Sequence, residues 1–216
     1  MAKSSTNGAT RQEILRAALK RFAHSGYAAT SIQQIVADAK VSKPALYYYF
    51  TDKAGLFQAL VNEAHDARYR LLQEAPARHQ KIRAQLESIL TSLFVYFQEN
   101  RDLVRISFAT MFAAPGEVPD GLTCQEKCER NFEFVHALIR RAQQAGELDR
   151  RFDSRELAYG IYGLTNFYLV ANLVMPECKP DRRSAGRIVD LFLAGAAPRT
   201  REASFRKSLH PSRSHS

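Results

Sequence analysis

Cysteine is scarce in this chain, and the motifs that mark most enzymes are missing. The 216 residues include three cysteines, an odd number that argues against the disulfide framework of a small secreted protein. Residues 1–12 lack the apolar core of a signal peptide, so we expect a cytoplasmic protein. The sequence contains no glycine-rich phosphate loop, no paired histidine–glutamate metal motif and no nucleophile beside a base. We therefore expect no cofactor and no enzymatic activity.

The alternating pattern of a half-buried strand is also absent. Apolar residues instead recur every three or four positions, which predicts an all-α fold. Pro76 should end a helix that begins after Asp52. Further helices are expected at 81–99, at 101–113 and from about 130 to Gly146, with a loop at 114–121.

Positive charge is concentrated at the two ends of the chain. Residues 1–57 hold eight Lys and Arg against three Asp and Glu, and residues 197–216 hold five against one. These differences, +5 and +4, account for the formal net charge of +9. A basic end of this kind suits a polyanion such as nucleic acid. The C-terminal segment lacks apolar periodicity, so we expect it to be disordered, adding either solubility or non-specific DNA affinity.

The segment from Thr30 to Phe57 predicts two short helices, a tight turn and the start of a third helix. Thr30 or Ser31 can cap the first helix, and Ser42 can cap the second. Asp52 can cap the third. Pro44 would fall in the first turn of the second helix, where its missing N–H costs nothing. Lys40 stands in the turn, at a position that can require a positive φ.

An additional helix is expected before this segment. Thr10 to Glu13 read as a capping box, and Gly26 suits the position just after a helix end. The three helices over residues 10–50 would enclose one small core. Its predicted members are Ile14, Ala18, Phe22, Ile32, Ile35, Leu46 and Phe50.

These residues resemble the DNA-binding segment of the TetR family of one-component transcription regulators. The family pattern is a threonine that opens the second helix, an Ala-Gly-Val-Ser turn, Leu-Tyr-x-x-Phe, and a lysine three residues later. The matching residues are Thr30, Ala39-Lys40-Val41-Ser42, Leu46-Tyr47-Tyr48-Tyr49-Phe50 and Lys53. Lys40 departs from the usual glycine.

The resemblance implies a set of contacts with double-stranded DNA. The residues that would face base edges in the major groove are Lys43, Pro44, Ala45, Tyr47 and Tyr48. Those that would cap the helices or contact phosphates are Thr30, Ser31, Ser42, Tyr49 and Lys53. The alternative is that the tyrosines belong partly to the core and the lysines are merely solvated.

With this resemblance, four regions are predicted. They are a flexible N-terminus (1–9), a helix-turn-helix DNA-binding domain (10–57), a helical effector-binding and dimerisation domain (58–196) and the basic tail (197–216). The family also implies a repressor that leaves a palindromic operator when a small effector binds. A non-specific basic DNA-binding protein and, less plausibly, an α-helical enzyme are the alternatives.

Two stretches, 157–175 and 188–197, are apolar on nearly every face and must be covered on every face. The first is long enough to span a membrane, but Asn166 and Asn172 would lack partners in lipid. We therefore expect no membrane insertion and a second copy of the chain as the cover. The resemblance implies the same homodimer, formed by the last two helices.

Aromatic residues are frequent in the predicted body, which suits a pocket for a small hydrophobic effector. For each of them, a place in an ordinary core is the alternative. The candidate effector-binding residues are Phe97, Arg105, Phe108, Phe112, Phe132, His136 and Tyr162.

Cys124 and Cys128 are four residues apart and can share one face of a helix. Together with His136 or Cys178 they could bind a metal or sense oxidation. Free thiols are the default for cysteines at this spacing, and no metal site is predicted.

Overall fold

The computed structural model describes residues 3–175 and 177–197, and regular structure in this part of the chain is helical. No strand is assigned there, and Pro115 and Val118 form only an isolated bridge. The α-helices, joined by one short 3-10 turn (η1) at Pro76–Arg78, are α1 (Lys3–Ala29), α2 (Ile32–Ala39), α3 (Lys43–Tyr49), α4 (Lys53–Glu74), α5 (Ile82–Glu99), α6 (Arg101–Ala109), α7 (Gln125–Gln144), α8 (Ser154–Val174) and α9 (Arg182–Ala196). The all-α prediction is confirmed.

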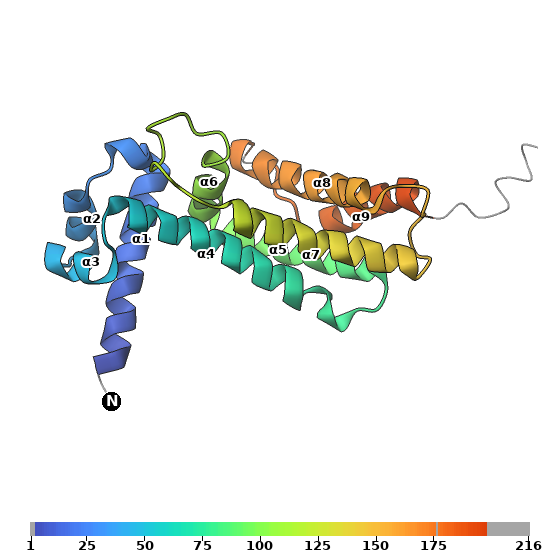
Figure 1. The fold of residues 1–216 in the computed structure, drawn as a ribbon, viewed down its shortest axis with the longest axis horizontal. Coiled ribbons are helices and arrows are strands. Elements are labelled where there is room, and N and C mark those ends of the chain that lie inside the picture. Colours follow the sequence, from blue (N-terminus) through green and yellow to red (C-terminus); the bar gives the residue numbers. More distant parts are fainter. Residues whose placement is uncertain (1–2, 176, 198–216) are drawn as a thin grey trace, which may run out of the picture.

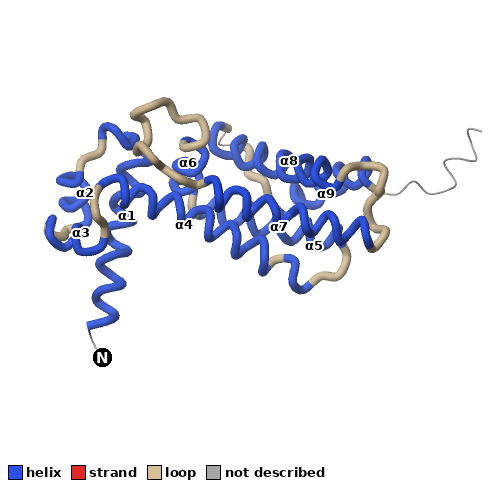
Figure 2. Tube along the Cα trace, in the orientation of Figure 1, coloured by secondary structure: helices blue, strands red, loops and turns tan. Residues whose placement is uncertain are grey.

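The molecule has a small head at one end of an elongated body (Figure 1). Helices α1, α2 and α3 form the head, and α4 runs without a break from the head into the body. Helices α5 and α7 pack beside α4, α8 packs on α7, and α9 packs on α5 and α8, whereas the short α6 lies between head and body. The loop between α6 and α7 arches over this junction (Figure 2).

The N-terminal end differs from the prediction. Helix α1 begins at Lys3, so residues 3–9 are helical rather than flexible. Thr10 lies inside the helix and is not its N-cap, because the Thr-x-x-Glu spacing also occurs within a helix and no proline interrupts residues 3–9. The break at Gly26 is confirmed, since this glycine has φ 77° and ψ 170° within the span of α1.

The predicted caps of the next helices form as expected. The Ser31 side chain accepts a hydrogen bond from the Gln34 N–H, and the Ser31 N–H donates one to the Gln34 side-chain oxygen. Ser42 accepts from the Ala45 N–H over 3.3 Å, and Asp52 accepts from the Gly55 N–H over 2.7 Å. Each bond satisfies a donor that the first turn would otherwise leave unpaired.

The core of the head contains the predicted residues and extends into the body. Ile14, Phe22, Ile35, Leu46 and Phe50 are buried, and Ile32 packs against them partly exposed. The same cluster includes residues that the sequence did not assign to the head. They are Leu60, Val61 and Ala64 of α4 together with Leu103 and Ile106 of α6. The predicted domain boundary at residue 57 therefore falls within α4 and divides residues that belong to one hydrophobic core.

Helix α6 is shorter than the predicted span of 101–113. It ends at Ala109, and Phe112 lies in the following loop with 85% of its surface exposed. Pro115 and Gly116, which has φ 86°, suit the irregular loop that replaces the end of the predicted helix. The helices expected after Asp52 and over 81–99 are confirmed as α4 and α5, and Pro76 opens η1.

Helix α8 is the described helix that is long and apolar enough to cross a membrane, a weak signal that core helices share. Its polar residues have partners within the chain. Asn166 accepts a hydrogen bond from Arg68, Asn172 donates to the Cys178 carbonyl over 2.6 Å, and Thr165 donates to the Ile161 carbonyl over 2.7 Å. The basic tail beyond residue 197 lies outside the described residues.

Lys40 has the left-handed conformation that its position suggested, with φ 53° and ψ 41°. A side chain in this conformation costs about 1 kcal/mol relative to glycine. We predict that Lys40→Gly raises the free energy of unfolding by about 0.5–1 kcal/mol, measured by urea denaturation. Lys40→Ala keeps the Cβ atom and should give no such gain. Equal stabilisation by both variants would mean that loss of the lysine side chain, rather than backbone strain, is responsible.

Candidate functional site

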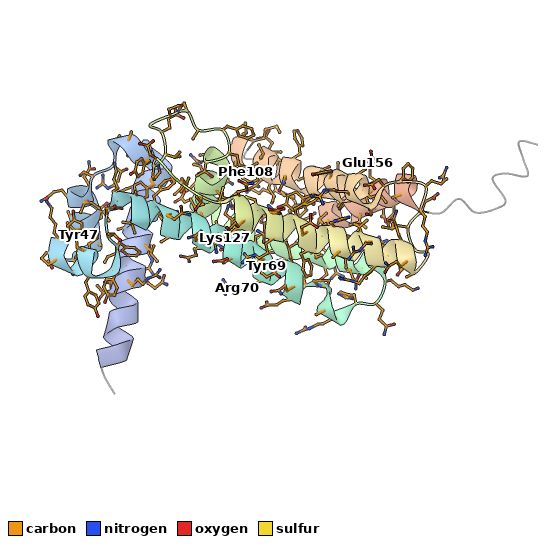
Figure 3. All side chains as sticks on the ribbon, in the orientation of Figure 1. Tyr47, Tyr69, Arg70, Phe108, Lys127 and Glu156 are labelled. Atoms are coloured by element: carbon orange, nitrogen blue, oxygen red, sulfur yellow. The ribbon has the colours of Figure 1, made fainter. Side chains whose placement is uncertain are left out.

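Helix α3 presents a basic and aromatic surface at the outer end of the head. Leu46 is completely buried, and it fixes which side of this short helix faces the core. Lys43 is exposed, and Tyr47 and Tyr48 are 51% and 73% exposed. Figure 3 marks Tyr47 at the head end of the molecule. Large aromatic side chains this exposed are not explained by the packing of the head.

The other predicted contact residues border this surface. Ser31, Ser42 and Pro44 are exposed, whereas Ala45 is half-buried. Tyr49 is half-buried too, and its ring packs edge-on against Tyr48 with the centroids 4.9 Å apart. We use the name recognition face for Lys43, Pro44, Ala45, Tyr47 and Tyr48, with Ser31, Ser42 and Tyr49 at its edge.

Thr30 and Lys53 occupy different positions from those expected. Thr30 is 2% exposed and its hydroxyl donates to the Gly26 carbonyl over 2.7 Å, so its side chain is not available to a phosphate in this structure. The Lys53 ammonium donates to the carbonyl oxygens of Tyr27 and Thr30, both at 2.9 Å, and lies over the Tyr27 ring. Lys53 therefore ties the start of α4 to the connection between α1 and α2.

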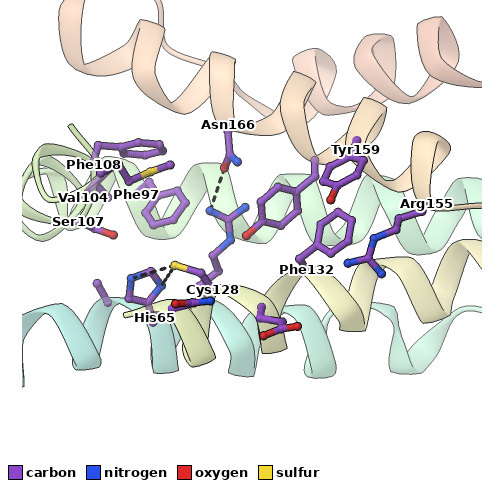
Figure 4. A pocket seen from close by; sticks show the side chains of 16 residues that line it. His65, Phe97, Val104, Ser107, Phe108, Cys128, Phe132, Arg155, Tyr159 and Asn166 are labelled. Atoms are coloured by element: carbon purple, nitrogen blue, oxygen red, sulfur yellow. Dashed lines mark hydrogen bonds between the residues drawn. The ribbon is translucent and has the colours of Figure 1, made fainter. Parts of the chain in front are cut away.

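The body contains a cavity of about 440 Å³ between α4, α5, α6, α7 and α8 (Figure 4). Aromatic and apolar side chains form most of its wall. The lining residues are Ala64, His65, Arg68, Phe97, Val104, Ser107, Phe108, Met111, Gln125, Cys128, Glu129, Phe132, Arg155, Tyr159, Tyr162 and Asn166. Its volume and composition are those of a site for a small organic molecule.

Arg68 is the buried cation of this cavity, with 9% of its surface exposed. One guanidinium nitrogen donates to the Asn166 side chain over 2.9 Å, and the guanidinium lies 4.5 Å from the centre of the Tyr162 ring. Its Nε is buried without a hydrogen-bond partner. Glu129 lines the same cavity, yet no carboxylate among the described residues forms an ion pair with Arg68. A buried charge in this state is destabilising unless a ligand compensates it.

Four of the predicted effector residues line the cavity, namely Phe97, Phe108, Phe132 and Tyr162. The other three do not. Arg105 is exposed on the opposite face of α6, and Phe112 projects from the loop. His136 lies behind Phe132, where its ring nitrogens are engaged by Glu133 at 3.1 Å and Ser154 at 2.8 Å. A helical stripe predicts burial, but it does not show which buried side chains border empty space.

His65, Arg68 and Asn166 also line the cavity but were not among the predicted effector residues. A signal was present, because Ala64 and Arg68 continue at four-residue intervals the inward stripe that begins with Leu56 and Leu60. A charged residue at an inward position of an apolar stripe indicates a buried polar site.

The two cysteines at the start of α7 face α4 rather than the partners suggested by the sequence. Cys128 lies 3.8 Å from the His65 ring, and the donor atoms of His65, Cys124 and Cys128 all lie within 4.8 Å of one another. Burial, reinforced by nearby Arg68 and Lys127, lowers the pKa of His65 to about 4, so its imidazole is neutral at pH 7. Burial and the neighbouring Cys124 raise the pKa of the Cys128 thiol to about 11.

Comparison with known proteins identifies the head. The family described as "Bacterial regulatory proteins, tetR family" matches residues 14–60. The uncharacterized regulator YuxN of Bacillus subtilis is 32% identical over 91 residues, which cover 42% of this chain but only 31% of YuxN. A second B. subtilis regulator of the helix-turn-helix type, YdgC, is 22% identical over 196 residues, covering 88% of this chain and 94% of YdgC.

Solved structures extend the similarity to the body. The SmeT–triclosan complex superposes with a TM-score of 0.73 at 23% identity, covering 88% of this chain and 92% of SmeT. SmeT is the repressor of a multidrug efflux pump of Stenotrophomonas maltophilia. At this identity the likeness establishes the fold. The head matched by the family model, together with these relatives of the helix-turn-helix type, shows that the chain belongs to the TetR family.

Proposed function

We propose that the protein is a dimeric repressor that leaves a palindromic operator when a small effector enters the cavity of the body. The observation that carries this proposal is the position of α6 between the cavity and the head. Val104, Ser107 and Phe108 line the cavity, whereas Leu103 and Ile106 of the same helix are buried in the core of the head. A ligand that displaces α6 must therefore disturb the packing of the head.

The recognition face would enter the major groove. Lys43 can donate to the guanine O6 and N7 acceptors, and Ala45 can contact a thymine methyl group. The exposed surface of Tyr47 and Tyr48 supports contact with base edges, and Ser31 and Tyr49 would contact the flanking phosphates. Lys53 would act mainly by holding the head together, since two of its three N–H donors are already used.

The outer faces of α8 and α9 would form the dimer interface. Phe167 is 68% exposed on α8, and Leu191 is 65% exposed on α9. A Cβ atom added at Gly163 or Gly195 would meet nothing within 4 Å in the single chain, so both glycines leave room for a closely approaching partner helix. Two heads related by a two-fold axis would then contact half-sites about one helical turn apart or slightly more.

The effector that fits this cavity is a hydrophobic molecule, and the wall supports an aromatic one carrying an acidic group. Phe97, Phe108 and Phe132 provide apolar contact, and the unpaired Arg68 provides the attraction for an anion. The similarity to SmeT, solved in complex with triclosan, supports a small-molecule ligand for this chain. Because Arg68 would be the partner of the acidic group, the affinity of the cavity would depend on the charge of the ligand.

Selection of bound fragments from random DNA tests the proposal as a whole. A dimeric repressor should enrich a palindrome, because the two heads contact equivalent sequences. A non-specific basic protein would enrich no sequence, and its affinity would depend on salt alone.

We predict that Tyr47→Ala lowers operator affinity at least about tenfold, because each direct base contact contributes about 1–3 kcal/mol. Lys43→Ala should also relax base preference at one operator position. Fluorescence anisotropy on the selected operator and its single-base variants measures both effects. Lys81→Ala removes an exposed lysine at the start of α5 and serves as the control. Unchanged affinity in Tyr47→Ala would exclude the proposed orientation of α3.

We predict that Phe167→Asp converts the dimer into monomers, since two carboxylates would be buried across a two-fold interface. Sedimentation velocity gives the oligomeric state directly. Phe167→Leu keeps an apolar side chain and should remain dimeric. If Phe167→Asp sediments as wild type, α8 does not form the interface.

We predict that Arg68→Met weakens binding of the anionic aromatic dye 1-anilinonaphthalene-8-sulfonate about tenfold or more, because an ionic hydrogen bond contributes about 1.5–3 kcal/mol. The uncharged dye Nile red should bind both proteins alike. Fluorescence titration of the two dyes separates the contribution of charge from that of cavity volume. An equal loss for both dyes would show that the substitution alters the cavity and not its charge preference.

A further inference from the structure

Three side chains with the chemistry of metal ligands meet at the head-side edge of the cavity. Cys124 is the N-cap residue of α7, and Cys128 follows one turn later on the same helix. His65 reaches toward them from α4, and its ring nitrogens lie 3.9 Å and 3.8 Å from the Cys128 sulfur. Figure 4 shows His65 and Cys128 facing each other across the gap between the two helices. We call these three residues the thiol–imidazole cluster.

The spacing of the cluster is close to that of a coordinated set. Its three donor atoms lie within 4.8 Å of one another. In a tetrahedral site with metal–sulfur bonds of about 2.3 Å and metal–nitrogen bonds of about 2.0–2.1 Å, ligand atoms lie about 3.4–3.8 Å apart. A closure of about 1 Å, within the reach of side-chain rotation, would therefore bring the donors around one ion. Two thiolates and an imidazole favour soft or borderline transition metals over magnesium or calcium.

The helices that carry the cluster are held in register by neighbouring residues. Asp66 accepts hydrogen bonds from Lys127 at 2.7 Å and from Arg130 at 2.8 Å, which ties α4 to α7 directly beside His65 and Cys128. The Asn131 side chain donates to the His65 carbonyl over 3.2 Å. These contacts fix the backbone on both sides of the cluster, so binding would require little reorganisation.

The cluster is also accessible from the cavity. His65 and Cys128 both line the cavity of about 440 Å³, which provides an entry path and room for a fourth ligand. The His65 ring contacts Cys128, another member of the cluster, whereas the His136 nitrogens contact Glu133 and Ser154.

We propose that His65, Cys124 and Cys128 form a binding site for one soft or borderline transition-metal ion, such as Zn²⁺ or Cu⁺, with an open fourth position toward the cavity. Binding replaces the two thiol protons, which are released to solvent, by two metal–sulfur bonds, and it requires no oxidant. The site would tie the N-terminal end of α7 to α4. It is independent of the identity of the operator and of the organic effector.

Cobalt titration of the reduced full-length protein tests this site, because thiolate-bound Co²⁺ in a tetrahedral site has intense charge-transfer and d–d absorption. We expect one Co²⁺ per chain, displaced by Zn²⁺. Cys124→Ser and Cys128→Ser should each weaken binding at least about 100-fold, since even residues outside the ligand set cost about 10–100-fold. His65→Gln should weaken binding and shift the d–d bands.

Cys178→Ser is the matched control, because Cys178 lies in the connection between α8 and α9 and should not contribute. Circular dichroism of each metal-free variant establishes that it is folded. Cys124 is half-buried at the N-cap position of α7, where serine is a favourable residue, so its serine variant should fold as wild type does. The proposal is overturned if reduced wild-type protein shows no thiolate–cobalt absorption, or if the Cys124→Ser/Cys128→Ser double variant binds Co²⁺ as tightly as wild type.

Discussion

The whole architecture depends on hydrophobic burial shared between the head and the body. Leu103 and Ile106 of α6 are buried with Ile14, Ile35 and Leu46 of the head. Burying each of these large side chains stabilises the fold by about 1.5–3 kcal/mol, so the junction is as strongly packed as either part. The head is consequently packed directly against the body and is not joined to it by a flexible linker. Its orientation is set by the same contacts that form one wall of the cavity.

Under the proposed function, that shared packing would couple DNA binding to the binding of a ligand. The family assignment rests on the head, and the cavity lies where α6 and α4 both reach it. A ligand changes an equilibrium only through its different affinity for two states. Here the two states would differ in the position of α6. The difference in ligand affinity between them would then arise from contacts with Arg68 and the aromatic wall.

Local signals in the sequence predicted the head almost completely. These signals are the helix caps at Ser31, Ser42 and Asp52 and the positive φ of Lys40. Each depends on residues a few positions apart, so it can be predicted from the local sequence. The lining of the cavity was predicted only in part, because it depends on which faces of distant helices leave space between them. The pairing of Cys128 with His65, 63 residues away, likewise depends on how α7 packs on α4 and has no local signature.

The unbroken course of α4 has a geometric consequence. Arg68 lies fifteen residues from Lys53 on this helix, a distance of about 22 Å at 1.5 Å per residue. A tilt of about 10° pivoting on the cavity therefore swings the head end by about 4 Å, slightly more than the rise of one base pair, about 3.4 Å. In the proposed dimer, a modest rearrangement around a ligand would then be enough to move the two heads out of phase with the grooves of a duplex.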